Sequence, residues 1–150
     1  MSLVYKIGDL FSSQASVLAH GCTASGKMNA GIARRFKKEF PDMYVDYMER
    51  SRNGNLIPGE SYVFQSAKGR TIANLMTQDE HGASEFLVDT CIGWLSNYAT
   101  TNNTPNIAIP KIGCGLGGLR WSSVRKIIEY HFSEKSCELE IWTRPQSSQQ

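Results

Sequence analysis

Glycines crowd a segment near the carboxyl end of the chain, residues 113–118, which reads Gly-Cys-Gly-Leu-Gly-Gly. The segment follows an apolar, strand-like stretch at 106–110 and precedes an amphipathic stretch that opens at Trp121. Glycines let backbone N–H groups approach a bound anion closely, and the N-terminus of a following helix adds partial positive charge. A strand, a glycine loop and a helix in this order therefore predict a binding site for a phosphate group.

A second unit of the same kind lies earlier in the chain. Residues 17–20 predict a short strand, residues 21–31 a loop bounded by glycines, and residues 32–40 a helix. Ile32, Phe36 and Phe40 recur every four residues and so share one helix face. We expect Asn29 to be the N-cap and Pro41 to stop the helix. Two such loops in one small chain predict a ligand that carries a diphosphate.

Both loops also match motifs of nucleotide enzymes, and each match is incomplete. Gly113, Gly115 and Gly118 fit the dinucleotide fingerprint, but that motif normally opens a longer βαβαβ unit than residues 119–150 can supply. Residues 21–27 fit a P-loop, yet Met28 stands where a magnesium-binding serine or threonine is needed. No apolar strand ends in an aspartate that could be the second metal ligand. We therefore expect neither dinucleotide redox chemistry nor NTP hydrolysis.

The composition is that of one ordinary globular domain. The chain has 150 residues, 41% of them hydrophobic and 20% charged, with a formal net charge of +2. We expect a domain over residues 1–145 and a polar, disordered tail at 146–150. The basic run at 34–38 is interpreted as a solvated helix face rather than a nucleic-acid site. No signal peptide and no apolar run of membrane-spanning length is recognisable, so we expect a cytoplasmic protein.

The four cysteines, Cys22, Cys91, Cys114 and Cys137, form no CxxC pair and no tight pair with histidine. This spacing argues against a metal site and, in a cytoplasmic chain, favours free thiols. Cys22 and Cys114 lie inside the two glycine loops and are interpreted as small packing residues rather than nucleophiles.

The remaining segments alternate between strand and helix patterns. We expect strands at 3–7, 61–64, 71–76 and 139–142, a polar loop at 78–82, and helices at 42–50, 87–98 and 121–132. Interleaved strands and helices predict an α/β fold of three layers, with a mixed central sheet flanked by helices.

Taken together, these segments resemble the macrodomain family of ADP-ribose-binding modules. The resemblance rests on residues 5–11, on 18–20 with 28–33, and above all on the long segment 109–121, and it extends over roughly residues 3–142. Within the family, the chain is most similar to the branch of terminal ADP-ribose glycohydrolases and DNA ADP-ribosyl glycohydrolase antitoxins.

The resemblance implies a role for each matched position. Asp9 would accept a hydrogen bond from the adenine amino group, with Leu10 beside it, and Thr23 and Asn29 would offer polar contacts to the ribose. The two loops would enclose the diphosphate and distal ribose through Ala30, Gly31, Ile32, Lys111, Ile112, Gly113, Cys114, Gly115, Leu116 and Gly117. The expected partner is ADP-ribose, an ADP-ribose derivative or an ADP-ribosylated macromolecule. We expect no cofactor, no metal, no membrane contact and a monomer.

The chain departs from the catalytic patterns of the family. Glycohydrolases of the similar branch have a lysine where this chain has Gln78, and some have an aspartate at Gly117. Another macrodomain class has an aspartate near Ala30, which is also absent. A glutamine can form no Schiff base and carries no charge. Hydrolysis by either route is therefore not expected.

Two histidines remain as candidate catalytic residues, His20 and His81. His20 resembles a histidine of the branch that dephosphorylates ADP-ribose 1''-phosphate, and His81 follows Gln78 closely enough to reach the distal ribose. His131 is interpreted as structural. The favoured function is therefore an ADP-ribose 1''-phosphate phosphatase. The alternatives are a non-catalytic ADP-ribose-binding module, or an ADP-ribosyl glycohydrolase that acts on protein or nucleic acid.

Overall fold

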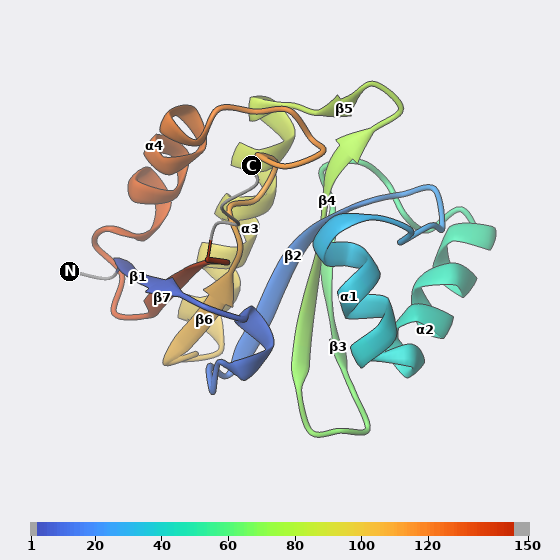
Figure 1. Cartoon of the computed structure of the whole chain (residues 1–150), viewed down its shortest axis with the longest axis horizontal. Coiled ribbons are helices and arrows are strands. Elements are labelled where there is room, and N and C mark those ends of the chain that lie inside the picture. The colour runs from blue at the N-terminus through green and yellow to red at the C-terminus, as the bar shows by residue number, and fades with distance from the viewer. Residues whose placement is uncertain (1–2, 146–150) are drawn as a thin grey trace.

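The computed structural model of the protein describes residues 3–145 and contains a twisted sheet with helices on both sides (Figure 1). The strands are β1 (Leu3–Ile7), β2 (Val17–Thr23), β3 (Ser61–Gln65), β4 (Thr71–Asp79), β5 (Gly82–Ala83), β6 (Asn106–Ile109) and β7 (Glu138–Thr143). The helices are α1 (Gly31–Glu39), α2 (Pro41–Arg52), α3 (Glu85–Thr101) and α4 (Trp121–Phe132), with a short 3-10 turn, η1 (Leu10–Ser12). The polar tail expected at 146–150 lies outside the described residues.

The sheet is mixed, with parallel pairing over most of its width. The strand order is β1-β7-β6-β2-β4-β3, and β5 pairs with β4 away from this path. β1, β7, β6, β2 and β4 are parallel to one another, whereas β3 and β5 run antiparallel to β4. Parallel strands need crossover connections, and the helices supply them. The carboxyl ends of β7, β6, β2 and β4 therefore meet along one edge of the sheet.

Each face of the sheet carries its own hydrophobic core. One core joins the sheet to α3 and α4, and the other joins it to η1, α1 and α2. Figure 1 shows these helices on opposite sides of the strands. Neighbouring residues of β2 serve different cores, Leu18 the second and Ala19 the first, because successive side chains of a strand point to opposite faces. The three-layer α/β architecture predicted from the sequence is confirmed.

Several predicted elements match the structure closely, and three details were wrong. Residues 21–23, predicted as the start of the first loop, instead extend β2 to Thr23. The strand at 3–7 and the helix at 121–132 have the predicted bounds. The helix expected at 32–40 begins one residue earlier, and its N-cap is Ala30 rather than Asn29, with no capping bond from a side chain. The polar loop expected at 78–82 is instead the end of β4 and the start of β5, which pair as a short hairpin. Pairing between β4 and β5 stabilises strand conformation here, although the sequence is polar.

All four cysteines are free. No helix within residues 3–145 combines the length and apolarity that a membrane span requires.

Candidate functional site

The two glycine loops leave the sheet from neighbouring strands and diverge. β2 and β6 pair in parallel, and the chain leaves β2 toward α1 on one face but leaves β6 toward α4 on the other. Loops that part in this way open a crevice beyond the carboxyl ends of the strands, where α/β sheets bind their ligands. The topology therefore places the two loops together at the edge where the strands end.

A cavity of about 540 Å³ lies between these loops, within the size range of small-molecule sites. Residues 30–33 line it from the first loop and residues 110–117 from the second. Gln78, at the end of β4, and Trp142, at the end of β7, also line it. These ends belong to four strands side by side, β7, β6, β2 and β4. At about 4.8 Å per strand the cavity spans about 14 Å, which suits an elongated ligand.

The first loop ends at a helix whose N-terminus is uncapped. Ala30 is the N-cap of α1 and has no side chain that could accept from the first turn. In the described chain, the N–H groups of Gly31, Ile32 and Ala33 donate to no other group. All three residues line the cavity. Unpaired N–H groups at the positive end of a helix form a ready binding site for an anion.

The second loop offers a further set of unpaired N–H groups. Its internal bonds include Gly118 N to Gly115 O at 3.1 Å and Leu119 N to Gly113 O at 2.8 Å. These bonds leave the N–H groups of Gly115, Leu116 and Gly117 without a partner among residues 3–145. Successive free amides in a tight loop form a concave anion-binding nest. The residues of both sets line one cavity, and no carboxylate among residues 3–145 lines it.

The hairpin of β4 and β5 fixes the shape of the second loop. A Cβ atom added at Gly117 would lie 2.7 Å from the carbonyl oxygen of Gly113 and 2.8 Å from the Cβ of Ala83 on β5. Neither neighbour can move away without moving backbone. At Gly115, by contrast, an added Cβ meets nothing within 4 Å. The loop conformation therefore requires glycine at 117, the position where some similar glycohydrolases have aspartate.

Helix α2 holds the first loop from behind. The Tyr47 hydroxyl donates to the carbonyl oxygen of Thr23, the Tyr44 hydroxyl to that of Gly26 at 3.2 Å, and the Ser51 hydroxyl to that of Ala24 at 3.1 Å. Three side chains of one helix thus fix the loop backbone before it reaches α1.

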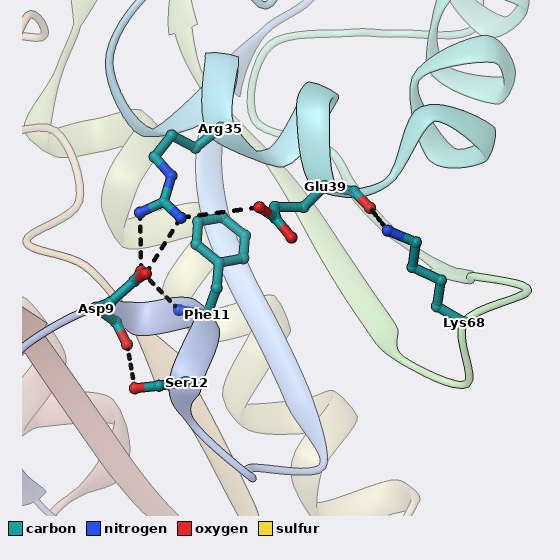
Figure 2. Close-up of polar contacts among 6 residues, drawn as sticks. All are labelled: Asp9, Phe11, Ser12, Arg35, Glu39 and Lys68. Atoms are coloured by element: carbon teal, nitrogen blue, oxygen red, sulfur yellow. Dashed lines mark hydrogen bonds and ion pairs between the residues drawn. The ribbon is translucent and has the colours of Figure 1, made fainter.

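Arg35 of α1 joins the cavity to the predicted adenine-binding aspartate. Its guanidinium donates to both carboxylate oxygens of Asp9, at 2.8 and 3.2 Å, and lies 4.6 Å from the centre of the Phe11 ring (Figure 2). The bidentate bond from Arg35, helped by the Phe11 N–H, lowers the pKa of Asp9 below its usual value. Asp9 is therefore a fixed, ionised acceptor beside the Arg35 end of the cavity.

His20 lies away from this cavity, in the core on the α1 side of the sheet. Its ring is fully buried, stacks on Phe36 with 3.8 Å between ring centres, and bonds through Nε2 to Asn74 Oδ1 at 2.6 Å. Burial lowers the pKa of His20 to about 4. A neutral imidazole without access to the cavity braces β2 against α1 and has no route to a bound phosphate. The sequence missed this burial because Phe36 reaches His20 only through the crossover of α1.

His81 and His131 are also outside the cavity. His81 occupies the tip of the β4–β5 hairpin with its side chain 84% exposed, and Glu80 is its neighbour at 3.5 Å. His131 bonds to Asp89 of α3 at 2.8 Å and so links α4 to α3. Its predicted structural role agrees with this placement.

The predicted ligand-binding residues divide into two groups. Those that line the cavity are Ala30, Gly31, Ile32 and the whole segment 111–117. Asp9 reaches it only through Arg35, Leu10 is buried in η1, the Thr23 carbonyl accepts from Tyr47 of α2, and Asn29 lines a separate hollow.

Sequence reasoning missed Arg35, Trp142, Thr143 and Arg144 as lining residues. Arg35 could have been found, since it lies one helical turn from Gly31 and Ile32. The end of β7 became part of the site only because β7 pairs with β6, which no local pattern reveals.

Comparison with known proteins gives a family match over most of the chain. The model of the family described as "Macro domain" matches residues 19–128. The ADP-ribose glycohydrolase OARD1 of Homo sapiens is 26% identical over 144 residues, which cover 94% of this chain and 91% of the relative. The ADP-ribose 1''-phosphate phosphatase of Meyerozyma guilliermondii is 28% identical over 163 residues, covering 86% of this chain and 93% of the relative.

The solved macrodomain of Mycobacterium tuberculosis DarG superposes on the fold with a TM-score of 0.88 at 25% identity. The match covers 97% of this chain and 98% of that structure. Bacterial DNA ADP-ribosyl glycohydrolases are also relatives, but the chain spans only 39% to 40% of the length of the curated bacterial relatives from Thermosipho africanus and Mycobacterium.

Proposed function

Because the chain belongs to the Macro domain family, we propose that it binds ADP-ribose in the cavity between its two glycine loops. The observation that carries this proposal is the pair of unpaired amide sets, one at the start of α1 and one at residues 115–117, whose residues line the same cavity. A diphosphate has two anionic groups and accepts from both sets at once. A monophosphate satisfies only one of them.

The two ends of the cavity suit the two ends of the same ligand. The ionised Asp9 carboxylate accepts from an exocyclic amino group, and Trp142 offers an aromatic surface to a purine. Gln78 and Gly21 lie at the other end of the strand row, where the distal ribose would sit. The adenine therefore lies at the β7 end and the ribose at the β4 end.

Titration calorimetry with ADP-ribose tests the proposal directly. We expect a dissociation constant in the low micromolar range, a free energy of about −8 kcal/mol, and much weaker binding of AMP, which lacks the second phosphate and the distal ribose. If ADP-ribose does not bind at millimolar concentration, the proposal fails.

A second candidate is hydrolysis of an ADP-ribose derivative, favoured by the names of the relatives. Dephosphorylation of ADP-ribose 1''-phosphate is the form predicted from the sequence, and a relative from yeast carries that name. The geometry supports it less than binding, because His20 is buried away from the cavity and Gln78 replaces the lysine. Incubation of ADP-ribose 1''-phosphate with excess protein decides it: release of inorganic phosphate establishes the activity, and its absence leaves a binding module or a glycohydrolase.

Cleavage of ADP-ribose from protein or nucleic acid is the remaining form of this candidate. It is tested with substrates of each kind, by release of free ADP-ribose. The cytoplasmic location and the monomeric state also remain predictions, and the latter is checked by light scattering.

A further inference from the structure

The positive charges of the cavity between the glycine loops are unevenly distributed along the row of strand ends. Arg35 of α1 and Arg144, which directly follows β7, line the cavity at the end assigned to the adenosine. The opposite end, assigned to the distal ribose, is lined by the uncharged Gln78. Lys111, at the end of β6, lies between them, and its ammonium is 5.3 Å from the centre of the Trp121 ring of α4. The adenosine end is therefore the more positive of the two.

The charge of Arg144 is not neutralised, whereas that of Arg35 is. Both carboxylate oxygens of Asp9 accept from Arg35, and one of them also accepts from the Phe11 N–H at 3.1 Å. Arg144 is exposed and makes no ion pair and no side-chain hydrogen bond within residues 3–145. It is near enough to Asp9 that its charge adds to the larger effect of Arg35 in lowering the pKa of that carboxyl. One positive charge therefore remains unpaired beside the adenosine.

Arg144 follows a strand end that its neighbours hold in place. The Gly8 N–H donates to the carbonyl oxygen of Thr143 at 2.9 Å, which continues the pairing of β1 with β7. Trp142 Nε1 donates to Glu140 Oε1 at 2.8 Å, and a Cβ atom added at Gly8 would lie 3.3 Å from the indole ring. The backbone that carries Arg144 is thus fixed beside the ring that we assign to the base, and the guanidinium lies within one side-chain length of it.

The diphosphate does not require the charge of Arg144. The amides at the start of α1 and at residues 115–117 already supply its donors. Arginine binds phosphate through two parallel N–H bonds, and in other α/β nucleotide sites an arginine beside the adenosine accepts a 2′-phosphate. We infer that the cavity takes an ADP-ribose that carries an additional phosphate on its adenosine ribose, and that Arg144 binds this phosphate. This assignment rests on the proposed function, which places the adenosine at the β7 end.

The same distribution of charge predicts where an additional phosphate gains nothing. A phosphate at the 1'' position of the distal ribose lies near Gln78, whose amide offers hydrogen bonds but no charge. A phosphate on the adenosine ribose lies near Arg144. The two ligands have the same net charge, so a difference in their affinities reports the position of the cation in the cavity.

The test is titration calorimetry of the whole chain at low salt with four ligands. They are ADP-ribose, its 2′-phosphate, its 3′-phosphate, and an analogue with a phosphonomethyl group at the 1'' position, which hydrolysis cannot remove. We expect the 2′- or the 3′-phosphate to bind about fivefold more tightly than ADP-ribose, which is the gain from one exposed ion pair. The 1'' analogue should bind no more tightly than ADP-ribose. The gain should shrink at high salt, because exposed charges are screened.

Two variants with the same chemical change identify the residue responsible. Arg144→Gln should bind the phosphorylated and unphosphorylated ligands about equally, because the additional phosphate has lost its partner. Arg34→Gln is the matched control. Arg34 is also exposed and without an ion pair within residues 3–145, but it lies on α1 and lines a separate hollow. This variant should keep the preference.

The contrary results are distinct. If ADP-ribose binds but neither the 2′- nor the 3′-phosphate binds more tightly, the inference fails and the proposed function stands. The inference also fails if the 1'' analogue gains as much, or if Arg144→Gln keeps the preference. If none of the four ligands binds at millimolar concentration, the proposed function fails and the inference fails with it.

Discussion

Both terminal nitrogens of Arg35 hold the carboxylate of Asp9, 26 residues away in sequence, at 2.8 and 3.2 Å. The same guanidinium lies over the Phe11 ring and lines the cavity (Figure 2). Planar bidentate pairs of this kind fix orientation as well as charge. Arg35 therefore positions the acceptor that we assign to the adenine amino group, and we expect its partner Asp9 to give the cavity a preference among purines.

Substitutions at this pair should weaken binding and change purine preference. We expect Asp9→Asn to lower the affinity for ADP-ribose about 10- to 100-fold, since a charged hydrogen bond contributes about 1.5–3 kcal/mol. We expect Arg35→Gln to lower it about tenfold by releasing the carboxylate. Calorimetry with ADP-ribose and with its inosine analogue, which has a carbonyl in place of the amino group, measures the preference. Arg125→Gln, on α4, is the control, and an unchanged preference in Asp9→Asn would remove the aspartate from the adenine site.

The second glycine loop should tolerate a methyl group at one position and reject it at another. We expect Gly117→Ala to weaken ADP-ribose binding at least about tenfold, because its Cβ collides with Gly113 O and Ala83. Gly115→Ala should change the affinity less than about threefold, since the space there is open. Gly115→Glu should abolish binding, because its carboxylate enters the anion site. Calorimetry on the three variants checks this order, and equal affinities in Gly115→Glu and Gly115→Ala would show that the diphosphate lies elsewhere.

Restoring a lysine at position 78 tests whether the rest of the site is competent for catalysis. Gln78 lines the cavity at the end of β4, so a lysine there can reach a ligand in it. We expect Gln78→Lys to gain glycohydrolase activity, measured as release of ADP-ribose from a modified peptide and a modified oligonucleotide. Gln65→Lys, on β3, adds the same charge away from the cavity and serves as the control. Unchanged activity in Gln78→Lys would mean that the cavity lacks more than the lysine.

Burial of His20 should make stability depend on pH in a defined window. The folded protein holds the imidazole neutral with a pKa of about 4, against 6.5 for the free side chain. Between these values the unfolded chain binds a proton that the folded chain does not, so the free energy of unfolding is complete above pH 6.5 and falls as the pH drops toward 4. At pH 5 the loss attributable to this residue is about 2 kcal/mol.

Urea unfolding at pH 5 and pH 7 measures this loss. A His20→Gln variant should show a smaller difference between the two pH values, whereas His81→Gln, which removes an exposed imidazole, should behave like the unsubstituted chain. If His20→Gln keeps the full pH dependence, another group is responsible.

Local patterns predicted the parts of the fold that depend on local physics. The apolar spacing along Trp121–Phe132 predicted the helix, and the glycines at 113–118 predicted a loop, which the structure shows with unpaired amides. The end of β4 was missed because Gln78 and Asp79 read as loop, while pairing with Ala83 and Gly82 makes them strand. The residue types at Gln78 and Asp79 do not reveal that β5, which follows them in the chain, folds back and pairs with them.

The candidate site was predictable where its residues are contiguous in sequence. The loop backbone at 111–117 could be assigned to the cavity in advance, whereas Trp142 and Arg144 enter it through the order of parallel strands. His20 was judged by its chemistry and its place at a strand end. Its burial against Phe36 depends on how α1 crosses the sheet. The positions of Trp142, Arg144 and His20 thus depend on packing between segments that are distant in sequence, which local patterns do not reveal.

Helix α1 starts without a cap, because alanine occupies the position that usually holds serine, aspartate or asparagine. Such an omission leaves the first turn about 1 kcal/mol less stable than a capped one. A phosphate that binds at Gly31, Ile32 and Ala33 would take the place of the missing N-cap side chain. Ligand binding and ordering of the first turn of α1 would then be thermodynamically coupled. The amide hydrogens of these three residues should therefore exchange quickly with solvent in the free protein and slowly in the complex, and their exchange rates report occupancy residue by residue.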